Sequence, residues 1–513
     1  HLTYLKFDES EVPEFSMDIY GQNLYPYGYE FKYPKAGEKN AVVKVHTIEL
    51  SSGNDQEVGL EPREYTMRIY AKNEASKMVV QTLNRHQNHL ELHEIDLNTG
   101  GTKVLLEEKD EAYVDIHDNL TFLANDDFIW TSEKDGYNHL YLYNADGSLK
   151  RQLTSGAFEV TAFYGYDKKR NRLFYQSTEP SSIERAIYRI SLSGNYKTRL
   201  TQEAGTYDAQ FSADYSYFIA TYQSSTKAPE FSLRDPRNGS LISVIKDNKA
   251  LESKLENYVL SPKEYGTLRV GNSTLNMYMI RPANFDPNKK YPLLMFQYSG
   301  PGSQQVADRW MGTNDYWHQM LAQQGYVIAC VDPRGTGFRG RDFKKVTYLN
   351  LVKLETEDQI AAAKKLSELP YIDADRTGIW GWSFGGHMST NALLKGNDVF
   401  EMAIAVAPVT SWRFYDTIYT ERFLRTPQEN PGGYDNESPF NYPELLKGKF
   451  LLVHGSADDN VHVQNSMRMI EALVQANKPF DWAIYPDRNH GIYGGNTRLH
   501  LYSKMTQFIL NNL

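Results

Sequence analysis

Residues 378–386 read Gly-Ile-Trp-Gly-Trp-Ser-Phe-Gly-Gly, and this stretch decides the fold of the second half of the chain. Its core, Gly381 to Gly385, has the Gly-x-Ser-x-Gly form of a nucleophile elbow, a sharp strand-to-helix turn that exposes a serine above a parallel sheet. A short apolar run precedes Ser383, and a helix rich in small residues is predicted after it. The motif alone is weak, because its fixed positions match by accident on the order of 0.2 times in a chain of this length at average residue usage. Whether Ser383 is catalytic therefore depends on finding an acid and a histidine elsewhere in the chain.

The surroundings of the motif alternate between strands and helices from about residue 256 onward, which indicates a parallel sheet. Amphipathic helices are predicted at 355–369 and 462–477; in the second, Met467, Ile470, Leu473 and Val474 share one face. A C-terminal helix has an apolar stripe of Met505, Phe508 and Ile509. The predicted strands are Tyr291–Tyr298, Gly325–Val331, Gly378–Gly381, Ala403–Ala407, Lys449–His454 and Phe480–Tyr485.

Two polar loops follow the last predicted strands and supply the partners that a serine nucleophile needs. One loop contains Asp458 and Asp459, and the other contains His490. Serine, then an acid, then histidine is the chain order of the triad in α/β-hydrolases. Spacing alone does not choose between the two aspartates. His454 and His462 are less suited to act as the base, because they flank the acid on its own loop.

The first half of the chain contains a repeat. Gly53, Gly100, Gly147 and Gly194 are spaced 47 residues apart, each after a β-rich run, and Gly239 closes a fifth unit. A period in the forties built from short strands and tight turns is typical of four-stranded propeller blades. We therefore predict an α/β-hydrolase, with a doubly wound and mostly parallel sheet, preceded by a β-propeller. Residues 1–255 form about five blades of an N-terminally truncated propeller, residues 256–513 form the catalytic domain, and the missing blades are expected before His1.

Composition excludes several other classes of protein. The chain has 513 residues and a formal net charge of −9 without a basic block, which argues against a nucleic-acid partner. No apolar run reaches the length of a membrane span. The single cysteine, Cys330, cannot form an internal disulfide. His46, His86, His89 and His93 do not have the spacing of a ligand set, so neither a metal nor another cofactor is predicted.

Several motifs together are specific for one family. Gly-Trp-Ser-Phe-Gly-Gly at 381–386, His-Gly-Ser-Ala-Asp-Asp-Asn-Val-His at 454–462 and Asn-His-Gly-Ile at 489–492 resemble the prolyl oligopeptidase family of serine peptidases. Residues 297–304, 407–422 and 8–13 extend the similarity, which is greatest to the dipeptidyl peptidases of that family. The resemblance covers the whole hydrolase half and, more loosely, the propeller half.

The resemblance implies a role for each matching residue. Asp458 would be the triad acid beside Ser383 and His490, and Asp459 would be structural. Tyr298 and the backbone N–H of Phe384 would form the oxyanion hole, where donors face the developing negative charge. Asn460 would bind a substrate carbonyl. An apolar slot for proline or alanine would be lined by Val409, Trp412, Tyr415, Tyr419 and Val461.

The resemblance also implies an activity, namely release of X-Pro or X-Ala dipeptides from free peptide N-termini through an acyl-enzyme. An endo- or acylaminoacyl-peptidase, or a catalytically dead propeller interaction module, is the alternative. Dipeptidyl peptidases anchor the substrate amine with a glutamate pair that precedes the segment at 8–13, and this pair is not present in the chain. Relatives further lead us to expect a homodimer and a periplasmic or cell-surface location.

Overall fold

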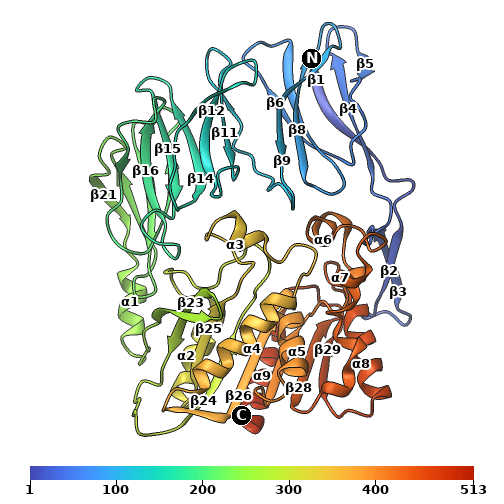
Figure 1. Cartoon of the computed structure of the whole chain (residues 1–513), viewed down its shortest axis with the longest axis vertical. Helices are drawn as coiled ribbons and strands as arrows, with labels where there is room; N and C mark the ends of the chain where they lie inside the picture. The colour runs from blue at the N-terminus through green and yellow to red at the C-terminus, as the bar shows by residue number, and fades with distance from the viewer.

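The computed structural model describes residues 1–513 and consists of two parts, a row of small β-sheets and a larger sheet flanked by helices (Figure 1). The first part begins with a three-stranded sheet and continues with four four-stranded antiparallel sheets. The first sheet contains β1 (Leu2–Asp8), β4 (Val42–Glu49) and β5 (Asn54–Glu57). The four others are β6 (Tyr65–Ala71), β7 (Lys77–Leu83), β8 (His89–Asp96) and β9 (Thr102–Lys109); β10 (Thr121–Phe122), β11 (Phe128–Ser132), β12 (His139–Tyr143) and β13 (Leu149–Gln152); β14 (Val160–Asp167), β15 (Arg172–Ser177), β16 (Ala186–Ser191) and β17 (Thr198–Arg199); and β18 (Thr206–Phe211), β19 (Phe218–Gln223), β20 (Glu230–Arg234) and β21 (Leu241–Lys246).

The repeated glycines occupy one equivalent place in these sheets, the turn before the last strand of each unit. All five have positive φ values, between +70° and +91°. Gly147 is also packed against the preceding sheet, because a Cβ there would lie 1.7 Å from the carbonyl oxygen of Leu105. The repeat in the sequence is therefore the repeat of a left-handed turn that glycine adopts without strain.

A hairpin that the sequence analysis did not predict leaves the propeller and lies beside the hydrolase (Figure 1). It contains β2 (Glu14–Ile19) and β3 (Tyr27–Lys32). The ring of Phe15 stacks on that of His462 with centroids 3.4 Å apart. The backbone N–H groups of Tyr20 and Gly21 each donate to the Asp487 carboxylate at 2.8 Å. The hairpin thus contacts both loops in which the acid and the histidine were predicted.

The second part is built on an eight-stranded sheet in the order β22-β23-β25-β24-β26-β27-β28-β29. The strands from β25 to β29 run parallel, whereas β22 and β23 add antiparallel. The sequence analysis predicted the six parallel strands within a few residues, except for the start of β26, and missed the first two. Their bounds are β22 (Glu264–Val270), β23 (Ser273–Ile280), β24 (Tyr291–Phe296), β25 (Val327–Asp332), β26 (Ile372–Trp382), β27 (Met402–Val406), β28 (Lys449–Gly455) and β29 (Asp481–Tyr485).

Helices cover both faces of this sheet. Alternate strand residues point to opposite faces, so that Leu293 and Met295 lie in one core and Leu294 and Phe296 in the other. The first core is covered by α4 (Lys353–Ser367), α5 (Phe384–Lys395) and α8 (Gln464–Gln475), and the second by α2 (Thr313–Gln323) and α9 (Thr497–Asn512). The remaining α-helices are α1 (Lys249–Leu255), α3 (Arg341–Lys345), α6 (Thr417–Leu424) and α7 (Pro431–Asp435). None of the helices has the length and hydrophobicity needed to cross a membrane.

Candidate active site

Ser383 occupies the turn between β26 and α5, which is the strand-turn-helix setting of a nucleophile elbow. Its φ of +62° and ψ of −119° are strained for a residue that has a Cβ. The Ser383 N–H donates to the Val406 carbonyl at 2.8 Å, which holds the turn against the next strand. A Cβ on Gly385 would lie 2.6 Å from the carbonyl oxygen of Gln297. Glycine at 385 therefore allows α5 to start directly against the end of β24.

Asp458 and His490 lie in contact, and burial distinguishes Asp458 from the adjacent Asp459. The Asp458 side chain is fully buried and its Oδ2 lies 2.7 Å from His490 Nδ1. Its Oδ1 accepts the backbone N–H groups of Asn460 and Val461 at 3.0 and 2.9 Å. Asp459 is exposed. Burial alone would raise the pKa of the Asp458 carboxyl, but hydrogen bonds with His454 and His490 outweigh it and lower the pKa to about 2.

His454 is a second histidine in contact with the same carboxylate. Its Nε2 lies 2.7 Å from the Val461 carbonyl oxygen and 3.2 Å from Asp458 Oδ2. Because both neighbours are acceptors, Nε2 carries the proton. The Ser466 hydroxyl, 2.7 Å from Nδ1, is then the donor to the other ring nitrogen. Sequence reasoning considered His454 only as a base, whereas its contacts make it a support for Asp458.

The loop that carries His490 is tied to the elbow through Trp382. The Trp382 indole N–H donates to the His490 carbonyl oxygen at 3.0 Å. The His490 ring is bonded to Asp458 through Nδ1, and no hydrogen bond joins the ring to the Ser383 hydroxyl. Hydrogen bonds between catalytic groups often form fully only when substrate is bound.

The two predicted oxyanion donors lie at adjacent ends of neighbouring elements. Tyr298 follows β24, and its ring centroid is 5.9 Å from that of Phe384, the first residue of α5. The first N–H groups of a helix have no partner within the helix and carry partial positive charge. Burial raises the pKa of the Tyr298 phenol, so the phenol stays protonated and able to donate.

The predicted apolar residues form one cluster next to the elbow. Val409, Trp412 and Val461 are buried in a core that also contains Phe384, and the two tyrosines pack against it. The Trp412 ring stacks on Tyr419 at 5.9 Å, and the rings of Tyr415 and Tyr419 meet edge to face at 5.3 Å. The Tyr415 hydroxyl donates to Asn460 Oδ1 at 2.6 Å. This bond leaves the Asn460 amide N–H groups available to another acceptor.

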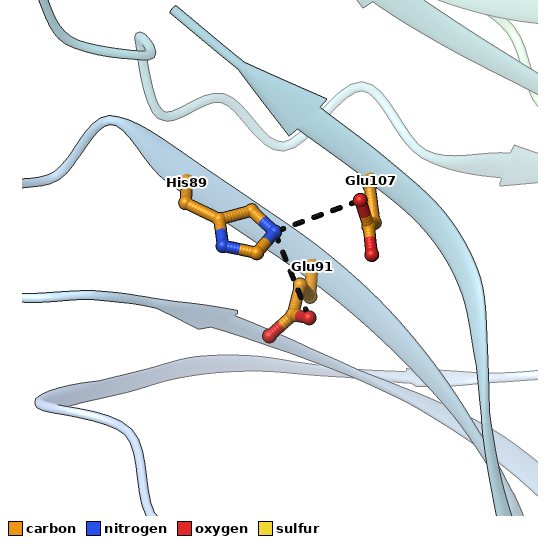
Figure 2. Close-up of side chains that lie close together, drawn as sticks. All are labelled: His89, Glu91 and Glu107. Atoms are coloured by element: carbon orange, nitrogen blue, oxygen red, sulfur yellow. Dashed lines mark ion pairs between the residues drawn. The ribbon is translucent and has the colours of Figure 1, made fainter.

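One histidine of the propeller lies near two carboxylates, as Figure 2 shows. His89 Nε2 is 3.6 Å from Glu91 and 3.8 Å from Glu107. Each carboxylate already has a cation, since Arg63 pairs with Glu91 and Lys109 with Glu107, both at 2.7 Å. His89, Glu91 and Glu107 are therefore part of a network of ion pairs, and we assign no ligand to them.

Comparison with known proteins matches both parts of the chain. Residues 1–229 match the model of the dipeptidyl peptidase IV N-terminal region, and residues 313–513 match that of the prolyl oligopeptidase family. The crystal structure of Porphyromonas gingivalis dipeptidyl peptidase 4 superposes with a TM-score of 0.97 at 46% identity, covering 100% of this chain and 73% of that one.

Two curated relatives are named "Probable dipeptidyl-aminopeptidase B". That of Phaeosphaeria nodorum is 35% identical over 100% of this chain and 60% of its own length. That of Podospora anserina is 36% identical over 100% of this chain and 59% of its own. The chain thus spans about three fifths of the length of these curated relatives. The matches confirm the predicted fold class, a β-propeller followed by an α/β-hydrolase domain. The chain belongs to the prolyl oligopeptidase family of serine peptidases.

Proposed function

We propose that this chain is the catalytic part of a serine exopeptidase that releases X-Pro or X-Ala dipeptides from free peptide N-termini. The observation that carries the proposal is the 2.7 Å pair of Asp458 and His490, whose loop is hydrogen-bonded to the residue before an elbow serine. The names of the relatives support the dipeptidyl peptidase class.

In the proposed mechanism, His490 takes the proton of the Ser383 hydroxyl as the serine attacks the scissile carbonyl. Serine is a poor nucleophile at neutral pH without such a base. Asp458 holds the imidazole in the productive tautomer and stabilises the imidazolium that forms. His490 then gives the proton to the leaving amine, and water hydrolyses the acyl-enzyme with the same groups.

Specificity is assigned to the apolar cluster beside the elbow. Val409, Trp412, Tyr415, Tyr419 and Val461 would enclose the side chain before the scissile bond, and Asn460 would bind a carbonyl of the substrate. Proline should be preferred over alanine by a moderate factor, because one methylene changes affinity by only about 1–3 kcal/mol in an apolar pocket. Larger side chains would collide with the aromatic rings.

Labelling and kinetics test the mechanism directly. A fluorophosphonate should label Ser383, and Ser383→Ala should lower kcat by a factor on the order of 10⁶. When Gly-Pro, Ala-Ala and Gly-Phe nitroanilides are tested in parallel, the first should be cleaved faster than the second, and the third should stay intact. A label on another serine would refute the nucleophile, and equal turnover of Gly-Phe would refute the pocket.

A requirement for a free amino group on the substrate is predicted for the full-length protein. Acetyl-Gly-Pro-nitroanilide should resist cleavage where Gly-Pro-nitroanilide is hydrolysed. Efficient cleavage of the acetylated substrate would favour an endo- or acylaminoacyl-peptidase. Absence of any labelling or turnover would favour a dead interaction module. The homodimer expected from the relatives stays a prediction, which light scattering would test.

A further inference from the structure

A cavity of about 490 Å³ lies outside the apolar cluster, and none of the proposed catalytic residues lines it. Its walls come from the start of α2, the loop after β24, the first turn of α9 and the propeller residue Gln223. It shares no lining residue with the cluster assigned to proline or alanine. The described mechanism therefore leaves this cavity unused.

The cavity is linked to the catalytic loop by direct contacts. Tyr493, three residues after His490, is part of its wall, as is Arg498. The Arg498 guanidinium lies between two rings, 4.7 Å from the centroid of Trp382 and 4.1 Å from that of Tyr493. Trp382 immediately precedes Ser383, so the Arg498 side chain stacks on the residue next to the proposed nucleophile.

Sheet topology places part of the cavity on the side of Ser383 that faces away from the apolar cluster. The serine follows β26, while the apolar residues follow β27 and β28 or lie on α6. Two cavity residues, Tyr278 and Phe296, lie on β23 and β24, on the other side of β26. If the acyl part of a substrate fills the apolar cluster, the leaving part extends toward β24. It starts at His490, because this residue protonates the leaving amine.

The charges in the cavity are unbalanced. Lys263 pairs with Asp315 at 2.7 Å, so the charges of these two side chains cancel. Arg309, exposed at the rim, and Arg498 form no ion pair, and the buried Nε of Arg498 has no hydrogen-bond partner. Two guanidinium groups without a counter-charge favour a carboxylate, which arginine binds through paired hydrogen bonds.

We infer that this cavity binds the leaving peptide and favours one that carries a carboxylate, with Arg498 and Arg309 as the recognising groups. The inference rests on the proposed function and extends it to the part of the substrate beyond the scissile bond. The carboxylate has two sources, an acidic side chain or the C-terminus of a short peptide.

Paired substrates separate these sources in the full-length protein. Gly-Pro-Ala-Glu-amide is compared with Gly-Pro-Ala-Gln-amide for the side chain, and Gly-Pro-Ala-Ala with its C-terminal amide for the terminus. The carboxylate should raise kcat/KM about 3- to 10-fold in at least one pair, the range between an exposed ion pair and a charge-assisted hydrogen bond. Raising salt from about 50 mM to about 500 mM should reduce this ratio, because salt screens exposed charges.

Variants assign the preference to this cavity. Arg498→Gln should bring the ratio close to one, and Arg309→Gln, at the exposed rim, should lower it without a risk to folding. Arg237→Gln is the matched control, since Arg237 is an exposed arginine on a propeller turn, paired with Asp235. This control should keep the wild-type ratio.

Gly-Pro-nitroanilide, whose leaving group has no carboxylate, separates failure of the inference from failure of the proposed function. If it is cleaved while both peptide pairs react equally, the inference is wrong and the proposed function stands. A preference that survives both Arg498→Gln and Arg309→Gln also overturns the inference. If the nitroanilide and all peptides stay intact, the proposed function fails and the inference with it.

Discussion

At the scale of single residues, the choice between two adjacent aspartates is made by burial. The sequence places Asp458 and Asp459 equally well for the acid, and only the resemblance favoured the first. In the structure Asp458 is buried between two histidines and two backbone N–H groups, whereas Asp459 faces solvent. A carboxylate with these partners is fixed in orientation, and its lowered pKa keeps it ionised near neutral pH.

Exchange of each aspartate for asparagine tests this assignment. Asp458→Asn should lower kcat about 10⁴-fold, because the amide stabilises the wrong tautomer of the base. Asp459→Asn, one position away and exposed, is the matched control and should change kcat little. Steady-state kinetics with Gly-Pro-nitroanilide measures both. Greater loss in the Asp459 variant, with its fold intact, would reverse the assignment.

Tyr298 is expected to act on the transition state more than on substrate binding. Tyr298→Phe removes one hydroxyl and keeps the ring that packs beside Phe384. The kcat should fall roughly 10²- to 10³-fold while KM changes little, as for other oxyanion donors. A variant with normal kcat and raised KM would instead make Tyr298 a residue that positions the substrate.

At the scale of elements, the predictable parts are those with a local signal. The parallel strands are apolar runs, and the propeller turns require glycine, so both appear in the sequence. The first two strands of the large sheet give a weaker signal, because β22 is mostly exposed at the edge of the sheet and the buried run of β23 is limited to Met277–Ile280. The hairpin β2–β3 is mostly exposed, and its place depends on His462 and Asp487, more than 400 residues away.

Helix α8 shows the same limit on a smaller scale. The sequence analysis placed Met467, Ile470, Leu473 and Val474 on one face, but Met467 and Val474 are exposed. The buried face is centred on Met469 and Leu473, together with the polar residues Asn465 and Ser466. These polar residues are buried because they bond to the loop after β27 and to His454. Hydrophobic periodicity does not contain that information.

Helix α4 contains a buried acid that should make stability depend on pH. Both carboxylate oxygens of Glu355 are buried without a hydrogen-bond partner, and burial raises its pKa from the ordinary 4.5 to about 8. The folded protein therefore prefers the protonated acid. Its contribution to stability is complete below pH 4.5 and is lost as the pH rises through 8.

Glu355→Gln keeps the shape of the neutral acid and removes the titration. The melting temperature of the variant should exceed that of the wild type at pH 8.5 and approach it at pH 5. Glu368→Gln, an exposed position just after the same helix, is the control and should follow the wild type at both pH values. Equal melting curves for the Glu355 variant and the wild type at pH 8.5 would show that the Glu355 side chain reaches water or a counter-charge.

At the scale of the whole molecule, charged contacts join the propeller to the parts of the hydrolase that form the site. On α3, Lys345 Nζ lies 2.9 Å from Asp110 and 2.6 Å from the Tyr113 carbonyl oxygen. On α6, which carries Tyr419 of the apolar cluster, Glu421 is fully buried and accepts two hydrogen bonds from Arg85 at 2.7 and 2.8 Å. The propeller thus supports the wall of the proposed substrate pocket.

This contact makes Arg85 a positioning residue for the pocket. Arg85→Met would leave the Glu421 carboxylate buried without its cation, which costs about 3–5 kcal/mol in comparable pairs. We expect a lower melting temperature and a raised KM for Gly-Pro-nitroanilide, with a smaller effect on kcat, because α6 holds Tyr419 and not the triad. Adding Glu421→Gln removes the uncompensated charge, so the double variant should recover stability relative to Arg85→Met. Arg68→Met is the control, since its pair with Asp118 is exposed. If Arg85→Met behaves like Arg68→Met in both melting temperature and KM, the propeller does not hold the pocket wall through this pair.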